Sequence, residues 1–301
     1  MKVDNAQLAA FAAVLEEGSF EAAARRLHVT PSAVSQRIRS LEERLGQILL
    51  QRGSPCLATD AGKKLARFAG QVAVLENEML RAIGLTDGDT RTAPRVPLAV
   101  NADSLETWFF SVFDTLPVEG VLRLDVRVED QDHSAVLLRE GAVMAAVSSS
   151  PVPVQGCRVE LLGVMRYLAL ASPDYVVRHL AAKPVDEALA SAPVLVFNGK
   201  DALQARFLSL CSDHPLEPPV HFIPSVHGFI EAARRGLGWG MMPAILSREA
   251  LKTGALVEIA PGRHLDVPLY WHCWRLESPV LDALSNAVRR AAASALREDN
   301  S

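Results

Sequence analysis

Residues 19–46 read SFEAAARRLHVTPSAVSQRIRSLEERLG, and this stretch decides the fold of the N-terminal part of the chain. Its layout predicts two short helices that meet at a tight turn near His28. Ser19 can accept hydrogen bonds from the first amides of the first helix, so we expect it to be the N-cap. Thr30 is a second capping residue. It is followed by Pro31, which loses no hydrogen bond at a first helical position, so the second helix should begin there.

The second predicted helix has one apolar and one polar face. Its apolar residues recur at spacings of four, three and four, which is a buried stripe on a 3.6-residue period: Val34, Ile38, Leu41 and Leu45. The other face carries Ser32, Ser35, Gln36 and Arg39. In a helix-turn-helix, such side chains near the start of the second helix meet the edges of base pairs in the major groove. The pattern therefore favours DNA binding.

An ordinary helical hairpin with a solvated polar face is the alternative. Residues 1–58 hold seven lysines and arginines against six aspartates and glutamates, which is weak electrostatic support for DNA binding. Phosphate binding depends on local positive charge, however. The arginines that can supply it are Arg25, Arg26, Arg37, Arg39 and Arg52.

Length and composition limit the class of protein. The chain has 301 residues, of which 49% are hydrophobic, enough for about two domains with buried cores. It starts MKVDNAQL without an apolar leader, and no stretch approaches the roughly 20 apolar residues that span a bilayer, so we expect a cytoplasmic location and no membrane contact. The four cysteines lie far apart without a CxxC pair, so we expect no disulfide framework, no metal site and no cofactor.

A helix over residues 4–15, with Asp4 and Gln7 at capping-box positions, should complete a three-helix core. Residues 47–58 then form a short wing that turns at Gly53 and Pro55.

A long helix should begin at Thr59. Its apolar residues alternate three and four apart, as in a heptad seam: Leu65, Phe68, Val72, Leu75, Met79 and Ala82. Such a seam predicts pairing of two subunits, and a helix that packs on its own domain is the alternative. Residues 84–97 break the pattern and are the predicted hinge.

Strands and helices alternate from Val96 onward. Strands at 96–100, 121–129 and 143–148 are separated by helices at 104–116 and 132–140, an order that predicts a parallel sheet covered by helices. A second unit combines strands at 167–171, 194–197, 220–223 and 239–242 with helices at 201–211 and 225–235, and a strand at 264–274 and a helix at 278–296 return to the first unit. Two α/β lobes with a cleft between them are expected.

The predicted domains are a winged helix-turn-helix at 1–58, a linker and dimerisation helix with its hinge at 59–90, and a two-lobed domain at 91–301. Its first lobe covers about 95–164 plus 266–301, and its second covers about 165–265.

Acidic and polar residues follow two of these strands and face the predicted cleft. Asp103 and Ser104 come after the first strand, where helix amides can hold a ligand carboxylate. Asp130 and Asp132 end the next strand. Carboxylates are stabilised near a cation, so a ligand with both a carboxylate and a cationic side chain suits this set. The alternative is that Asp103, Asp132 and Asp201 are plain helix caps.

The first 90 residues resemble the N-terminal domain of the LysR-type transcriptional regulators. The resemblance is carried by PSAVSQRIRSLEERLG at 31–46, by GSFEAAARRLHVT before it, and by Arg52 and ATDAG (58–62) after it. It implies that Ser32, Ser35, Gln36 and Arg39 approach DNA and that Arg52 does so from the wing; Arg25 and Thr30 complete the predicted DNA-binding residues. Leu50 departs from the family, which usually has phenylalanine there, and should alter the packing of the wing.

Nearly the whole chain is similar to the branch of this family that senses lysine and arginine and controls export of basic amino acids. The matching segments are VNADSLETWF (100–109), EDQDHS (129–134), GFIEAARRGLGWGMMP (228–243) and LDVPLYWHCW (265–274). The similarity implies an activator-type switch of homodimers or homotetramers on promoter DNA, in which L-lysine or L-arginine binds between the lobes and changes contacts to RNA polymerase. It also implies ligand contacts by Asp103, Ser104, Asp130, Asp132 and Asn198, and leaves lysine or arginine open.

The expected architecture is thus an α+β multidomain protein: a winged helix-turn-helix, a long linker helix and a two-lobed α/β effector domain that resembles periplasmic binding proteins. An enzyme is the competing class, but the chain has no G-x-S-x-G elbow, phosphate-binding loop or metal-ligand spacing. A transport-type binding protein would need a secretion signal and has no use for the N-terminal helices. A regulator of this family with another small-molecule effector stays open.

Overall fold

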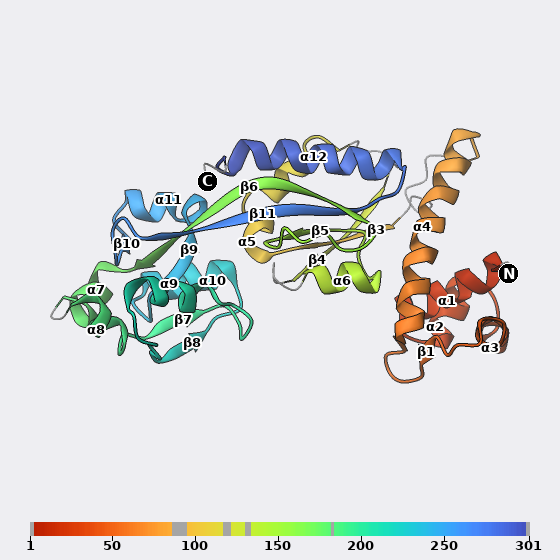
Figure 1. Ribbon diagram of the computed structural model, residues 1–301, viewed down its shortest axis with the longest axis horizontal. Helices are drawn as coiled ribbons and strands as arrows, with labels where there is room; N and C mark the ends of the chain where they lie inside the picture. Colours follow the sequence, from red (N-terminus) through yellow and green to blue (C-terminus); the bar gives the residue numbers. More distant parts are fainter. Residues whose placement is uncertain (1–2, 86–94, 117–121, 130–133, 182–183, 299–301) are drawn as a thin grey trace.

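The computed structural model describes residues 3–85, 95–116, 122–129, 134–181 and 184–298 (Figure 1). The N-terminal helices lie at one end of the molecule, and a long sheet with its covering helices forms the rest. Helix α4 (Asp60–Ala82) stands between the two parts. Most of the predicted hinge falls outside the described residues.

The N-terminal domain consists of α1 (Asn5–Glu17), α2 (Phe20–Arg26), α3 (Pro31–Leu45) and a wing made of β1 (Leu50–Gln51) and β2 (Leu57–Ala58). The predicted caps are confirmed, because the Ser19 and Thr30 side chains each accept from the amide three residues further on. Asp4 caps α1 in the same way. The Gln7 side chain does not complete a capping box; it donates to Ser40 Oγ and so joins α1 to α3.

A compact apolar core holds this domain together. It contains the predicted stripe of α3, with Val34, Ile38 and Leu41 buried and Leu45 packed against them. Leu50, the departure in the wing, is also buried there. Glu42 fixes the wing to α3, because its Oε1 accepts from the Leu49 and Leu50 amides at 2.8 and 3.3 Å.

Helix α4 packs with one face on its own C-terminal domain. Arg67 donates to the Gln155 carbonyl, with 2.6 Å between Nη1 and the oxygen, and its guanidinium lies 5.5 Å from the Trp274 ring centroid. One turn from the helix end, Glu78 Oε1 accepts from Ser278 Oγ at 2.5 Å, at the start of α12 (Pro279–Ala295). These contacts join two turns of the linker helix to the C-terminal domain.

The predicted heptad seam of α4 lies on another face. Phe68, Leu75 and Met79 are exposed, with 44 to 50% of their surface accessible, whereas Leu65 packs against the N-terminal core and Val72 is half-buried. The alternative of a helix packed on its own domain therefore describes one face of α4. Because the seam is exposed in this single chain, pairing of two subunits through it stays a prediction.

One mixed sheet runs through the C-terminal domain. In the described residues its strands are β3 (Arg95–Val100), β4 (Arg123–Val128), β5 (Ala145–Ser148), β6 (Cys157–Ala171), β9 (Gly240–Pro243), β10 (Val257–Glu258) and β11 (His264–Trp274). Their order is β10-β6-β11-β5-β3-β4, with β9 also paired to β6. β3 is parallel to β4 and β5, as predicted for the first unit.

The long antiparallel pair β6 and β11 continues from the first unit into the second (Figure 1). The pairing shifts by one residue between Leu269 and Tyr270, where Leu162 has no partner and Gly163 has a φ of 137°. The second unit adds the parallel pair β7 (Val194–Val196) and β8 (Val220–Phe222). Its helices are α7 (Pro173–His179), α8 (Val185–Leu189), α9 (Leu203–Cys211), α10 (Val226–Arg234) and α11 (Ala244–Lys252).

The prediction of one helix over residues 104–116 is wrong. The segment forms the short helix α5 (Ala102–Leu105) and a 3-10 turn η1 (Phe109–Val112). The hydroxyl of Thr107 donates to the Asp103 carbonyl at 2.6 Å and so competes with the helical ladder. The bend also lets Trp108 and Phe109 become fully buried. The third helix of this unit, α6 (Ser134–Glu140), begins close to the expected position.

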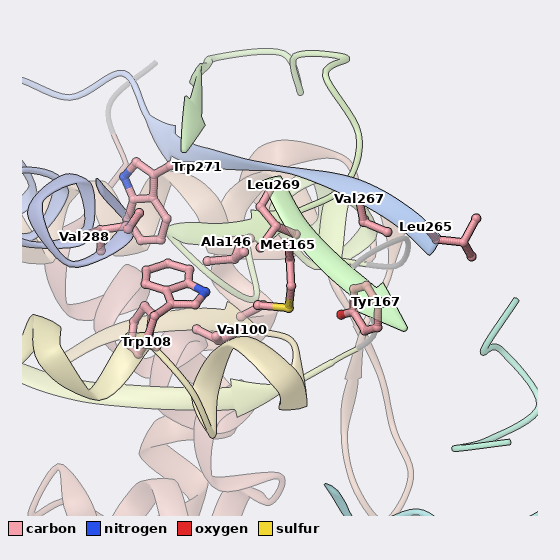
Figure 2. Packing of buried hydrophobic residues seen from close by; sticks show 14 of the residues in the cluster. Val100, Trp108, Ala146, Met165, Tyr167, Leu265, Val267, Leu269, Trp271 and Val288 are labelled. Atoms are coloured by element: carbon pink, nitrogen blue, oxygen red, sulfur yellow. The ribbon is translucent and has the colours of Figure 1, made fainter. Parts of the chain in front are cut away.

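The core beneath α12 contains large aromatic side chains. Figure 2 shows the indole rings of Trp108 and Trp271 beside each other, with Val288 of α12 next to Trp271. The indole N–H of Trp271 donates to Ser285 Oγ at 3.0 Å. Tyr167 lies further along β6, toward the second unit.

Candidate functional site

The first candidate site is the polar face of α3. Thr30 caps this helix and its hydroxyl lies 2.9 Å from Ser32 Oγ, so both are held at the helix N-terminus. Ser32, Gln36 and Arg39 are exposed, and Ser35 is half-buried. The structure thus presents all four predicted base-reading side chains on or near one exposed helical surface.

The turn before α3 is tight. His28 has a φ of 53°, a left-handed conformation that is uncommon for residues other than glycine, and the Val29 amide donates to the Ala24 carbonyl at 3.0 Å. This turn sets α3 against α2 as the sequence predicted.

Two of the predicted phosphate-binding arginines are exposed on the elements that flank α3 in the sequence. Arg25 is exposed at the end of α2, and the exposed Arg52 of the wing lies 5.5 Å from the Phe20 ring centroid, which orients its guanidinium. Arg26, also considered from its charge, is instead paired with Glu16 and Glu17 of α1. Its charge is therefore largely compensated within the domain.

The second candidate site is a cavity of about 170 Å³ between the two units of the C-terminal domain. It lies at the carboxyl ends of β3, β4 and β7, and α10 and β9 form its opposite wall. Its polar lining consists of Asn101, Asp103, Glu129, Asn198, Asp201 and Arg206, and its apolar lining includes Phe197, Phe229, Ile230, Met241 and Met242.

Asp103 is positioned by a hydrogen bond across the sheet. The Tyr167 hydroxyl of β6 donates to Asp103 Oδ2 at 2.8 Å. The N-cap of α5 is Asn101, whose side chain makes no capping hydrogen bond. The alternative that Asp103 is a plain helix cap is therefore wrong, and Asp103 lines the cavity.

Asp201 shows the opposite behaviour. Its two carboxylate oxygens accept from the Phe197 and Leu203 amides, each at 3.0 Å. The N-cap of α9 is Ala202, so Asp201 is not the plain helix cap of the alternative; its carboxylate binds backbone amides on either side of it. Asn198 likewise has a local role, because its Oδ1 accepts from the Lys200 amide at 2.8 Å, although its side chain also lines the cavity.

The other predicted ligand residues are Ser104, Asp130 and Asp132. Ser104 is fully buried and does not line the cavity. Asp130 and Asp132 lie outside the described residues. Of the five predicted contacts, Asp103 and Asn198 are the two that the described structure brings to the cavity.

Besides Asp201, three polar residues of the cavity lining were not among the predicted contacts. Asn101 is 94% buried, lines the cavity, and within the described chain its Oδ1 has no hydrogen-bond partner. Glu129 and Arg206 add one charge of each sign. The sequence offered one signal for a place at the cavity: Asn101 and Glu129 come directly after a strand, and Arg206 lies in the first turn of α9.

No cluster of three or more histidine, cysteine or acidic side chains suited to a metal ion occurs within the ranges that the structure describes. The four cysteines carry no disulfide. Of the helices that can be described, none combines the length and apolar character needed to cross a membrane.

A winged helix-turn-helix joined through a long helix to a two-lobed domain with a polar cleft defines a DNA-binding regulatory protein. The chain matches the model of the bacterial regulatory helix-turn-helix proteins of the lysR family over residues 6–63 and the model of the LysR substrate binding domain over residues 121–293. It belongs to the LysR family of transcriptional regulators.

Individual relatives are similar over almost the full chain. The transcriptional regulator LysG of Mycobacterium tuberculosis is 51% identical over 98% of this chain and 96% of its own length. The crystal structure of ArgP from the same organism superposes with a TM-score of 0.88 over 99% of this chain and all of that one, at 51% identity. Full-length LysG of Corynebacterium glutamicum with bound effector arginine gives a TM-score of 0.77 at 39% identity, over 98% of this chain and 99% of that one.

Proposed function

We propose that this chain is a transcriptional activator that senses L-arginine or L-lysine in its inter-lobe cavity and controls genes such as a basic amino-acid exporter. The observation that carries the proposal is the lining of the cavity, in which Asp103 and Glu129, which follow the neighbouring strands β3 and β4, line one cavity. The arginine-bound relative, 39% identical, supports the same class of ligand.

The cavity offers partners for each charged group of a basic amino acid. Asp103 and Glu129 supply carboxylates for cationic groups, and the unpartnered Oδ1 of Asn101 supplies a further acceptor. Arg206 is the cationic side chain in the lining and suits the ligand carboxylate. The apolar walls, among them Phe229 and Met241, suit the methylene groups of lysine or arginine.

Promoter DNA is the proposed macromolecular ligand of the N-terminal domain. Ser32, Ser35, Gln36 and Arg39 would read base edges, while Arg25, Thr30 and Arg52 would contact the backbone. The exposed seam at Phe68, Leu75 and Met79 supports pairing into homodimers, and pairs of dimers would give the homotetramer. Contacts to RNA polymerase, a cytoplasmic location and the domain division at about residues 58 and 90 belong to the same proposal.

Calorimetric titration of the purified chain tests the ligand class. L-arginine, L-lysine and L-glutamine are titrated at one salt concentration, and saturable binding of one or both basic amino acids without glutamine is expected. Binding of glutamine with equal affinity, or of none of the three, would contradict the sensor proposal.

Selection from a random DNA pool tests whether the N-terminal domain binds DNA sequence-specifically. We expect enrichment of a sequence with two-fold symmetry, because a dimer presents two copies of α3 to two half-sites. A pool that stays random after repeated selection would contradict sequence-specific binding.

A further inference from the structure

We propose that Lys200 is an intramolecular competitor of the cationic ligand, because its ammonium group is paired with the carboxylate of Glu129 that the ligand cation would bind. The inference rests on the proposed function and adds a residue that sets the ligand concentration at which the protein responds. It starts from one ion pair at the edge of the cavity, with 2.9 Å between Lys200 Nζ and Glu129 Oε1.

The ion pair connects the two sides of the cavity. Glu129 follows β4, and its amide donates to the Val100 carbonyl at 3.2 Å, so its backbone is fixed to the first unit. Lys200 lies 71 positions further along the chain, in the loop between β7 and α9 of the second unit. Glu129 and Asn198 both line the cavity, so the pair lies where a ligand between the lobes would meet Glu129.

The loop that carries Lys200 is held by its own polar groups. The Lys200 amide donates to Asn198 Oδ1, and the Asp201 amide donates to the Asn198 carbonyl at 3.1 Å. The Asp201 carboxylate accepts from the Phe197 amide in the loop and from the Leu203 amide at the start of α9. This bonding presents the Lys200 side chain toward Glu129 without any contribution from a ligand.

The chemistry of Lys200 matches that of the proposed ligand. A lysine or arginine ligand that approaches Glu129 brings an ammonium or guanidinium group to a carboxylate that already binds an ammonium group. Two cations bound to one carboxylate lie close together and repel each other, so the ligand must displace Lys200 from Glu129. Part of the binding free energy is then used for the displacement, and the apparent affinity is lower than it would be without Lys200.

The size of the effect follows from the exposure of the pair. The side chains of Lys200 and Glu129 are 48% and 27% exposed, and exposed ion pairs change an equilibrium by a factor of about two to five. Removing the lysine should therefore strengthen ligand binding by that factor, which is measurable by calorimetry.

The experiment is a titration of L-arginine into full-length wild type, Lys200→Gln, Glu129→Gln and the double variant. Lys200→Gln should bind about two- to fivefold more tightly than wild type. In the Glu129→Gln background the same change should have no effect, because the carboxylate for which the two cations compete is gone. Lys252→Gln, an exposed position at the end of α11, removes the same charge away from the cavity and should leave the affinity unchanged.

The titrations distinguish a failure of the competitor role of Lys200 from a failure of the proposed function. Unchanged or weaker binding by Lys200→Gln would overturn the competitor role, and so would a gain that persists in the Glu129→Gln background or appears equally in Lys252→Gln. If wild type binds no basic amino acid, the proposed function itself fails. A failure of the competitor inference alone leaves wild-type binding of arginine or lysine intact.

Discussion

Replacing Asp103 by asparagine should weaken binding of a basic amino acid while leaving DNA binding intact. The substitution keeps the shape of the side chain and removes its charge. Asp103 is half-buried at the cavity and is oriented by the Tyr167 hydroxyl, so its carboxylate is positioned before a ligand arrives. A hydrogen bond to a charged group contributes about 1.5 to 3 kcal/mol, which corresponds to a loss of roughly ten- to a hundredfold in affinity.

The assay is calorimetric titration with L-arginine and L-lysine at fixed salt, accompanied by a gel-shift titration with a selected DNA site. Glu106→Gln is the matched control, because this substitution also removes one negative charge. Glu106 is exposed directly after α5 and does not line the cavity. Glu106→Gln should bind like wild type. Equal affinity of Asp103→Asn and wild type for both amino acids would refute the argument that Asp103 binds a ligand cation.

Three further changes test other parts of the structure. Arg39→Ala should weaken binding to a selected DNA site by about 1 to 3 kcal/mol, and unchanged gel-shift titration would remove Arg39 from the base-reading set. Gly62→Ala should lower the free energy of unfolding, measured by urea titration, by about 1 to 3 kcal/mol, since the added Cβ would lie 2.1 Å from the Leu49 carbonyl oxygen. Gly199→Ala should leave it unchanged, because a Cβ added there has no other atom within 4 Å. His272 is fully buried, and this burial lowers its pKa below the ordinary 6.5, so the unfolded chain takes up the proton at a higher pH than the folded chain. The free energy of unfolding should therefore fall as the pH drops below about 6.5. His272→Gln should show a smaller fall in a series of urea titrations, and a pH profile identical to that of wild type would count against this reasoning.

The parts of the fold that depend on local sequence could be predicted closely. Ser19, Thr30 and Pro31 define the starts of α2 and α3 because capping involves residues within one turn. The helix over 104–116 was mispredicted because its interruption depends on burial of Trp108 and Phe109 against α12, far away in the chain. β6 is longer than its predicted five residues for the same kind of reason, since its first half is defined by pairing with β11.

The candidate cavity was predictable in outline and not in its contacts. The position of Asp103 after a strand indicated a place at the cleft, because parallel strands end at one edge of a sheet. The partners Tyr167 and Lys200 could not be inferred, since each reaches its carboxylate from an element more than sixty residues away. Side-chain pairs of this separation depend on the relative placement of two units, which no local pattern contains.

The long strands β6 and β11 limit how the two halves of the effector domain can move. Because both strands run through both units, a change in the angle between the units must bend a hydrogen-bonded pair of strands instead of turning a flexible connection. The unpaired Leu162 and the neighbouring Gly163 make the register shift the most compliant point of this pair. A pair of strands bent at this point would return to its original angle once the bending force is removed, so a change of angle that a ligand imposed would be reversed when the ligand leaves.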